Sequence, residues 1–484
     1  MTPAKETTMS LSPIVEMSAC PLSRAIHARD VSCVEVMQAY LAHIERYNPG
    51  VNALVALREP QTLLAEASQC DRELQAGQSR GWMHGMPQAV KDLAAVAGLR
   101  TTQGSTLFAE QVPRQDAISV SRVRASGAIV IGRSNVPEFG LGSHTYNGVY
   151  GTTRNAYDNR LCAGGSSGGA GVALAMRMLP VADGSDMMGS LRNPAAFNNV
   201  FGLRPSQGRV PYGPANEVFV SQLGIEGPMG RTVEDVAQLL QTQAGFDPRA
   251  PLSRDHYAPQ AALARDFKGT RIGWLGDYDG YLPFEPGVMS LCEQALKDFA
   301  YLGCEVETCR PQYSMERLWK CWLTLRQWQV AGNLGAIYAD PARREHLKPE
   351  AQWEVEGGLA LSGQQVFAAS VARSEWYRAL LALFERYDYL LLPSAQVFPF
   401  DAQLAWPRHI AGQKMDTYHR WMEVVIGATL AGLPAMSIPV GFSPQGLPMG
   451  LQIIGKPQAD HAVLQLAYAH EQATGWVQQR PPSF

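Results

Sequence analysis

The stretch "LCAGGSSGGAGVALAMRM", residues 161–178, combines five glycines and two serines in one short loop with a segment predicted to be helical. Glycine at this density lets the backbone approach another group closely, because it has no Cβ and tolerates conformations closed to other residues. Ser166 and Ser167 at its centre could belong to a phosphate cradle, to a nucleophile elbow, or to an active site of another kind.

The first two interpretations fit the loop poorly. Successive backbone N–H groups leading into a helix favour an anion, but the loop has no Gly-Lys-Ser/Thr ending and does not fit G-x-G-x-x-G. The elbow pattern G-x-S-x-G fits with either serine at its centre, and a loop so rich in glycine and serine matches it easily. An elbow also needs an acid and then a histidine downstream, and no downstream histidine stands in an evident motif.

The third interpretation pairs the loop with "ADGSDMMGSLRNPAAFNNVFGLRP", residues 182–205. Ser190 follows Gly189 and precedes a helix that we predict at Pro194. A small residue before a serine allows backbone amides to converge near the hydroxyl, which is what an oxyanion hole requires. Ser190 is therefore a candidate nucleophile.

A candidate base lies upstream, where "GMPQAVKDLAAVAG" places Lys91 in an otherwise apolar predicted strand. A buried lysine loses its proton more readily than an exposed one, so it can serve as a base near neutral pH. Lys91, Ser166 and Ser190 would then form a proton chain that needs no histidine.

Alternating strands and helices predict an α/β protein with a largely parallel sheet. A capping-box pattern at Ser32 and Glu35 begins one predicted helix, which Asn48-Pro49-Gly50 should end. Further predicted strands are 51–57, "TRIGWLG", "CEVETC", "YDYLLLP" and "PAMSIPVGF", and further predicted helices are 60–76, 287–302 and the segment "QADHAVLQLAYAHEQATGW".

Composition excludes several classes of function. The net charge of −3 and the lack of a Lys/Arg tract argue against binding to nucleic acid or an anionic membrane. No run of about 18 apolar residues could span a bilayer, and the N-terminal twenty residues lack the apolar core of a signal peptide. The eight cysteines form no C-x-x-C pair, which favours reduced thiols in a cytoplasmic protein.

These segments together resemble the amidase signature family, the Ser–cisSer–Lys hydrolases, over nearly the whole chain. Besides the three segments already quoted, four others match its blocks in order: "TTQGS" (101–105), "SNVPEFGLG" (134–142), "GPMGRTVEDVAQLL" (227–240) and "AGLPAMSIPVGFSPQGLPMGLQIIG" (431–455). Seven blocks in order are far more specific than any single match.

The resemblance implies an α/β/α sandwich around one large mixed, largely parallel sheet. It implies one domain over 1–484, with a helical region at 1–76, the catalytic core at 77–250 and a variable, substrate-shaping region at 251–484. It also implies that Ser190 is the nucleophile, that Ser166 relays the proton through a cis-linked position, and that Lys91 is the base. The expected oxyanion hole consists of the backbone amides of Met187, Met188, Gly189 and Ser190. No cofactor or metal is implied.

One departure from the family pattern bears on substrate. The family usually carries a second glycine where this chain has Met188, so the methionine could narrow or line the acyl pocket. The residues expected to contact substrate are Leu141, Gly142, Ser143, Tyr146 and Arg209. The aromatic stretch around 399–421 fits a broad hydrophobic pocket.

We therefore expect an amide hydrolase acting through an acyl-enzyme on hydrophobic or aryl amides, with aryl esters and carbamates as further substrates. The resemblance extends to the branch that cleaves anilides and urethanes. The alternative is the glutaminase-like subunit of a tRNA-dependent amidotransferase, for which the sequence reveals no charged pair to hold glutamine. A further alternative is a non-catalytic scaffold. The expected partner is a small amide or carbamate, and a homodimer is left open.

Overall fold

The computed structural model describes residues 11–255 and 262–483. The first half contains α1 (Pro13–Glu16), α2 (Ala19–Ala28), α3 (Cys33–Val51), α4 (Pro60–Gln75), α5 (Ile118–Ala125), α6 (Gly168–Ala175), α7 (Arg192–Phe197) and α8 (Val233–Gln243). The second half contains α9 (Val288–Tyr301), α10 (Met315–Ala339), α11 (Pro341–Arg344), α12 (Pro349–Leu359), α13 (Gly363–Phe384), α14 (Ile426–Ala431), α15 (Asp460–Thr474) and α16 (Trp476–Gln479).

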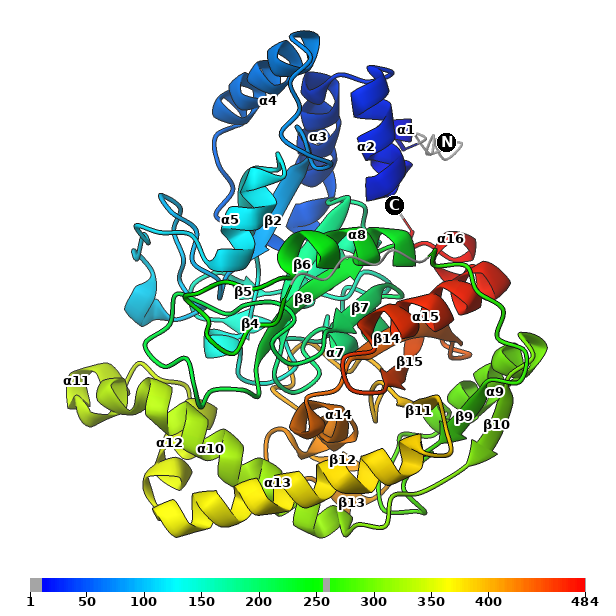
Figure 1. Ribbon diagram of the computed structural model, residues 1–484. Helices are drawn as coiled ribbons and strands as arrows, with labels where there is room; N and C mark the ends of the chain where they lie inside the picture. Colours follow the sequence, from blue (N-terminus) through cyan, green and yellow to red (C-terminus); the bar gives the residue numbers. More distant parts are fainter. Residues whose placement is uncertain (1–10, 256–261, 484) are drawn as a thin grey trace, which may run out of the picture.

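An eight-stranded sheet forms the centre of the molecule (Figure 1). Its strands, in spatial order, are β10 (Glu305–Thr308), β9 (Arg271–Trp274), β11 (Tyr389–Pro393), β15 (Pro448–Gly455), β14 (Ala435–Phe442), β7 (Phe201–Arg204), β8 (Ile225–Gly230) and β6 (Val181–Asp186). Helices α7, α8, α9 and α15 pack on this sheet. The predicted α/β class and the mixed central sheet are confirmed.

The direction of the strands differs from the expected, largely parallel arrangement. Parallel pairing joins β9 to β10 and to β11, whereas the remaining neighbours in the large sheet pair antiparallel. The reason lies in the connections: β9 and β10 are joined through α9, and β10 and β11 through α10–α13, while β14 and β15 are joined by a short turn. Strands joined by a tight turn pair antiparallel, and parallel pairing needs a longer crossover.

A second sheet carries Lys91. Strand β3 (Ile129–Ser134) pairs in parallel with β2 (Pro87–Lys91) and antiparallel with β1 (Leu54–Val55). Strand β2 also lies beside β6, the edge strand of the large sheet (Figure 1). The Asp183 carboxylate on β6 accepts a hydrogen bond from the backbone N–H of Lys91 at 3.0 Å, which fixes the end of β2 against the large sheet.

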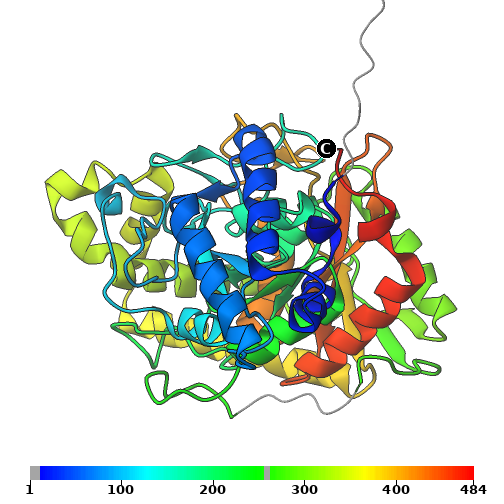
Figure 2. The ribbon, with the colours of Figure 1, turned by 90° about the horizontal axis from the view of Figure 1, so that it is seen from above.

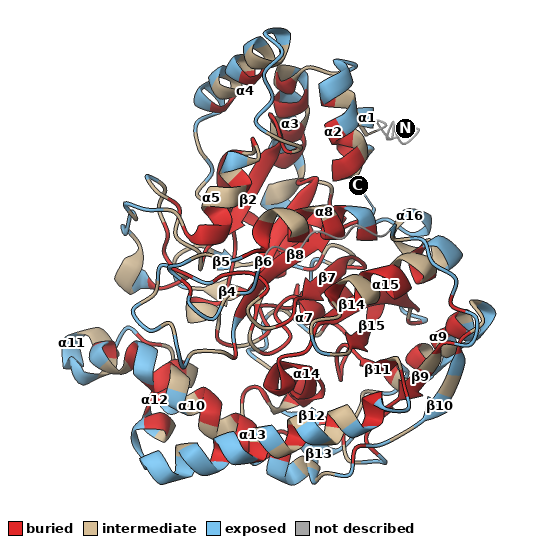
Figure 3. Ribbon diagram, in the orientation of Figure 1, coloured by how far each residue is buried: buried red, intermediate tan, exposed pale blue. Residues whose placement is uncertain are grey.

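The glycine loop lies where two hydrophobic cores meet. One core fills the space among α2, α3, α4 and α6 and includes Ala163, and the other covers the large sheet and includes Cys162. Helices α2, α3 and α4 stand together at one end of the molecule in Figure 1, and Figure 2 shows them from above. Helix α7, which follows the Ser190 segment, and helix α14 are buried along their whole length (Figure 3).

Most local predictions are confirmed within a few residues. The capping box at Ser32 and Glu35 begins α3, with a hydrogen bond of 3.1 Å from the Glu35 N–H to Ser32 Oγ. The prediction that Asn48-Pro49-Gly50 ends this helix misses the end slightly, because α3 includes Pro49, continues to Val51 and is capped by Asn52 in the left-handed conformation. No helix of the described residues is long and apolar enough to cross a membrane. Residues 1–10, on which the signal-peptide prediction partly rests, lie outside the described residues.

Candidate active site

Lys91 ends β2 with its side chain buried among three serines. Its Nζ lies within hydrogen-bond distance of Ser166 Oγ at 2.8 Å, of Ser167 Oγ at 2.8 Å and of Ser185 Oγ at 2.9 Å. Burial lowers the pKa of Lys91 to about 7, although the carboxylates of Asp186, Asp183 and Glu226 act in the opposite direction. The amine is therefore available as a proton acceptor near neutral pH.

The glycine loop presents Ser166 to that amine. The peptide bond between Gly165 and Ser166 is cis, as the resemblance implies. Ser143 holds the loop on its other side, because its Oγ donates to the Gly165 carbonyl at 2.6 Å and accepts from the Gly165 N–H at 3.1 Å. The glycines serve close backbone packing, since a Cβ at Gly169 would collide with the backbone nitrogen of Asn135.

Ser190 follows β6 in a turn organised by Asp186. The buried Asp186 carboxylate accepts from the N–H of Gly189 at 2.9 Å and from the N–H of Leu191 at 3.2 Å. It also pairs with the Arg192 guanidinium at 3.0 Å. Burial alone would raise the pKa of Asp186, but Arg192 holds it well below its usual range. Asp186 and Arg192 are thus the structural brace of the turn.

A hydrogen bond joins the two serine segments directly. The N–H of Ser167 donates to the carbonyl of Ser190 at 3.2 Å. The structure therefore brings Lys91, Ser166 and the Ser190 segment together, as the sequence predicted. Ser167 and Ser185 also contact Lys91, although neither had a predicted role. Their positions in the sequence could have indicated these contacts, because Ser167 is next to Ser166 and Ser185 lies in the same sequence block as Ser190.

The expected oxyanion donors differ from one another in their surroundings. The Gly189 N–H is directed to Asp186 rather than into the site, which leaves the amides of Met187, Met188 and Ser190 as the candidates. The Met188 side chain is only 3% exposed and packs in the core of the large sheet. Met187 is partly buried, and its sulfur lies 3.4 Å from Nη1 of Arg326.

Four of the five expected substrate contacts line one small cavity beside the glycine loop. They share it with Lys348 of the segment before α12 and with aromatic side chains from the later part of the chain. The residues that line this cavity include Leu141, Gly142, Ser143, Tyr146, Lys348, Trp406, Tyr418 and Trp421. The tryptophans and Tyr418 come from the aromatic stretch around 399–421, as predicted.

The fifth expected contact, Arg209, points elsewhere. Its guanidinium pairs with Asp460 at the start of α15 at 3.2 Å and donates to Gln458 Oε1 at 3.0 Å. Arg209 follows the Ser190 block closely in sequence, but the chain passes through β7 between them and carries it to the α15 side of the sheet. The expectation that Arg209 contacts substrate is corrected accordingly.

A buried ion pair that the sequence did not reveal borders the Met187 segment. Arg326 of α10 pairs with Glu354 of α12 at 2.5 Å, and Tyr418 Oη bonds both, at 2.6 Å to Arg326 and 2.7 Å to Glu354. The second Glu354 oxygen, Oε2, is buried without a hydrogen-bond partner among the described residues. Arg326 and Glu354 sit on ordinary helical segments, so no sequence motif marks them.

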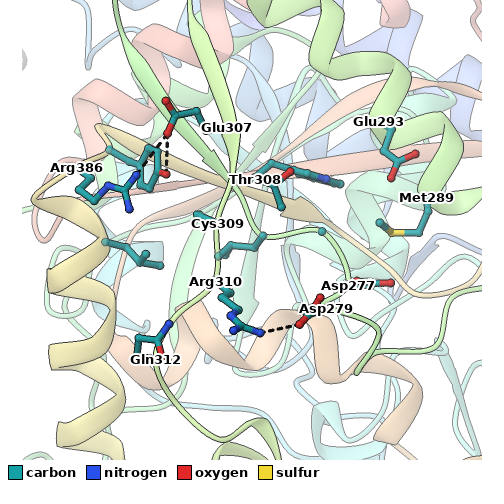
Figure 4. A pocket seen from close by; sticks show the side chains of 15 residues that line it. Asp277, Asp279, Met289, Glu293, Glu307, Thr308, Cys309, Arg310, Gln312 and Arg386 are labelled. Atoms are coloured by element: carbon teal, nitrogen blue, oxygen red, sulfur yellow. Dashed lines mark hydrogen bonds and ion pairs between the residues drawn. The ribbon is translucent and has the colours of Figure 1, made fainter.

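A further large pocket lies apart from these serines. It has a volume of about 750 Å³ and opens at the carboxyl ends of β9 and β10, between α9 and α13 (Figure 4). Its charged side chains are largely paired with one another, as Arg310 is with Asp279 at 2.7 Å and Arg386 with Glu307 at 3.6 Å. It contains none of the residues expected to act in catalysis.

One group of metal-binding residue types occurs among the described residues. Cys70, Glu73 and His84 lie within reach of one another, but the ring nitrogens of His84 and the Glu73 carboxylate are already engaged. Both His84 ring nitrogens bond to backbone groups, Nε2 to the Cys70 carbonyl at 2.9 Å and Nδ1 to the Arg80 N–H at 3.1 Å. Glu73 pairs with Arg80 at 2.5 Å. We therefore interpret this group as a structural contact of α4.

Comparisons with known proteins agree with this architecture. The family model named Amidase matches residues 35–464, so the chain belongs to the amidase family. The chain is 34% identical to the A-type subunit of the glutamyl-tRNA(Gln) amidotransferase of Methylococcus capsulatus, covering 95% of this chain and 97% of that protein. It is 36% identical to the protein of the same name from Thermus thermophilus, covering 95% and 99%.

The fold is also similar to a solved bacterial aryl acylamidase of the amidase signature family. That likeness has a TM-score of 0.90 at 29% identity and covers 96% of this chain and 98% of the other. The solved A-type subunit of the glutamyl-tRNA(Gln) amidotransferase from Thermotoga maritima gives a TM-score of 0.75 at 27% identity, covering 96% and 94%. The chain is therefore an amidase signature enzyme that acts on carbon–nitrogen bonds.

Proposed function

We propose that the chain hydrolyses amides through an acyl-enzyme on Ser190. Ser190 Oγ forms a bond to the amide carbon while its proton passes to Ser166, whose own proton passes to the Lys91 amine. Collapse of the tetrahedral intermediate breaks the C–N bond, and the leaving amine takes a proton back through Ser166. Water then attacks the ester on Ser190 with the same relay and releases the acid.

The observation that carries this proposal is the position of the Lys91 amine. It is buried, 2.8 Å from Ser166 Oγ, and has a pKa of about 7. A neutral amine at this place can accept a proton, whereas an exposed lysine would be an ammonium ion at neutral pH. The hydrogen bond between the Ser167 N–H and the Ser190 carbonyl holds the two serine segments together.

For the substrate, the first candidate is an aryl amide, with aryl esters and carbamates as related substrates. It is supported by the fold likeness to an aryl acylamidase and by the aromatic side chains Trp406, Tyr418 and Trp421 at the small cavity, whose volume of about 10 Å³ has to widen to admit an aryl group. Aromatic walls bind flat aromatic groups through large contact areas and offset ring packing.

The second candidate is glutamine, with the chain acting as the glutaminase-like subunit of an amidotransferase and needing protein partners. The names of the curated relatives favour it over the aryl-amide candidate. The buried Arg326–Glu354 pair beside Met187 also favours it, because it supplies the opposite charges that the sequence did not reveal. An α-carboxylate and an α-ammonium group could be bound by such a pair.

The hydrolytic proposal is tested by a fluorophosphonate probe followed by mass spectrometry. We expect the adduct on Ser190, no labelling of Ser190→Ala, and normal labelling of the control Ser121→Ala, which removes a hydroxyl on α5. Ser190→Ala should lose almost all activity, while Ser166→Ala should keep a small remnant because the oxyanion donors survive. An adduct on Ser166 would support the nucleophile-elbow interpretation instead.

The two substrate candidates are separated by kcat/KM for 4-nitroacetanilide and for glutamine with the purified chain. The double variant Arg326→Met/Glu354→Leu removes both buried charges together and should lower kcat/KM for glutamine far more than for the anilide, although it also removes two hydrogen-bond partners of Tyr418. Its control is Arg317→Met/Glu375→Leu, which removes a partly exposed pair of 2.6 Å between α10 and α13. Glutamine turnover above anilide turnover selects the amidotransferase candidate.

A further inference from the structure

Glu226 of β8 is a buried acidic residue that the proposed reaction does not yet use. Strand β8 pairs antiparallel with β6, and the register places Glu226 directly opposite Ser185. Residues directly opposite in such a pair project from the same face of the sheet with their Cβ atoms about 5 Å apart. Ser185 Oγ in turn accepts a hydrogen bond of 2.9 Å from the Lys91 amine. The Glu226 side chain is thus a neighbour of the group that holds Lys91.

Three carboxyl groups act on Lys91 electrostatically, and two of them have their oxygens committed elsewhere. Asp186 is bonded to the Ser190 turn and to Arg192. Asp183 accepts from Gln88 Nε2 at 3.1 Å and from the backbone N–H of Lys91 at 3.0 Å.

Glu226 differs from both. It is 7% exposed, and its Oε2 has no hydrogen-bond partner among the described residues. A buried carboxyl oxygen without a partner is costly, so its retention calls for an explanation.

The other elements packed around this cluster add few charges. Arg133 on β3 donates to the Lys91 carbonyl at 3.0 Å and to Asp92 at 3.1 Å. Ser119 on α5 hydrogen-bonds to the Glu226 side chain. Tyr212, in the segment between β7 and β8, is more than half exposed, and the charge of Glu226 acts to raise the pKa of its phenol. Glu226 is therefore the carboxyl near Lys91 whose charge is least compensated by other groups.

We propose that Glu226 is a positioning residue for Lys91, whose carboxylate stabilises the ammonium ion formed when Lys91 receives the proton from Ser166. The inference rests on the proposed function. In that step the Ser190 O–H bond breaks, a new N–H bond forms at Lys91, and Glu226 stays ionised without exchanging a proton. An anion beside a buried amine favours its charged form and makes it a stronger base.

The titration of the two groups supports this arrangement. Burial raises the pKa of Glu226 to about 7, while the charge of Lys91 acts to lower it. Both groups therefore change protonation in the same pH range, and the acidic limb of the rate profile belongs to the pair rather than to Lys91 alone. Removing the Glu226 charge leaves a profile that reports Lys91 by itself.

The test is the pH dependence of kcat/KM for 4-nitroacetanilide in three variants. Glu226→Gln and Glu226→Met remove the charge, and Glu226→Asp retains it. In both neutral variants we expect the acidic limb to move to lower pH by about one unit, a tenfold change in the ratio of protonated to free amine. The rate at the alkaline plateau should fall because the ammonium is less stabilised. Glu226→Asp should keep the limb near its original position.

A merely structural role for Glu226 would change stability or the plateau rate and leave the limb in place. The proposal is overturned if the acidic limb stays at its wild-type pH in a neutral variant that folds. It is also overturned if Glu226→Asp shifts the limb as far as Glu226→Gln does. Failure of the hydrolytic proposal is distinguishable, because Ser190 would then carry no probe adduct and Ser190→Ala would retain its rate. If Ser190 is labelled and the limb stays unmoved, the inference about Glu226 alone fails.

Discussion

Replacement of Lys91 by methionine gives a measure of the buried amine that does not depend on catalysis. In the unfolded chain the lysine binds its proton up to a pKa of about 10.4, while in the folded protein it loses that proton at about 7. Between these values unfolding takes up one proton. Unfolding is therefore favoured at the lower end of the range, and the wild-type protein gains stability as the pH rises.

The size of the effect follows from the shift itself. One pH unit within this window changes the free energy of unfolding by about 1.4 kcal/mol for a single proton. Between pH 8 and 9.5 the wild type should gain about 2 kcal/mol relative to Lys91→Met, which has no proton to exchange at this position. This window lies above the titration of Glu226, whose pKa burial raises to about 7.

The assay is urea unfolding followed by circular dichroism at several pH values, with the difference between the two proteins taken at each pH. Groups that titrate in both proteins cancel in that difference. Lys320→Met, at an exposed position on α10, controls for the loss of one lysine. A difference between wild type and Lys91→Met that stays constant from pH 8 to 9.5 would falsify the neutral amine and, with it, the role of Lys91 as the base.

The remaining predictions concern the reaction and its support. Lys91→Arg should be nearly inactive, because a guanidinium keeps its proton; a variant with most of the wild-type rate contradicts the mechanism. Wild-type kcat/KM should rise with pH below about 7 and level off above it, since Lys91 and Glu226 both titrate with a pKa of about 7. Met188→Gly should lower stability by about 2–4 kcal/mol through the cavity it leaves, measured by urea unfolding, and change preference among acyl groups without abolishing activity. Arg192→Met should cost about 3–5 kcal/mol, because it leaves the Asp186 carboxylate buried with a partner removed; a loss below about 1 kcal/mol in urea unfolding would contradict the brace.

The candidate site could be predicted from sequence where a local requirement fixes the residue type. Close backbone packing at Gly169 requires glycine, and the turn at Gly189 has a φ of +78°, which favours glycine. Lys91 was recognisable as a single cation in an apolar strand. Such constraints act within a few residues, so they leave a readable pattern in the chain.

What could not be predicted depends on contacts between distant parts of the chain. Arg326 and Glu354 are 28 residues apart on two helices, and only the packing of α10 against α12 makes them a buried pair. The antiparallel neighbours of the large sheet depend on which strands meet after folding, which alternation of elements does not specify. Helix α3 continues past Asn48, and the Asn48 side chain stabilises the chain just after the helix. Its Oδ1 accepts hydrogen bonds from the N–H groups of Ala53 and Leu54.

The brace at Arg192 has a consequence for the synthesis of the protein. Its guanidinium donates to the Val425 carbonyl at 3.0 Å, to Thr429 Oγ1 at 3.0 Å and to Gln452 Oε1 at 2.8 Å. These acceptors lie 233 to 260 residues downstream, so a nascent chain that has emerged only past Ser190 lacks them and its Arg192 brace is incomplete. Reactivity should consequently arise only after β15 has left the ribosome, and a messenger truncated before that strand should yield chains that a fluorophosphonate does not label.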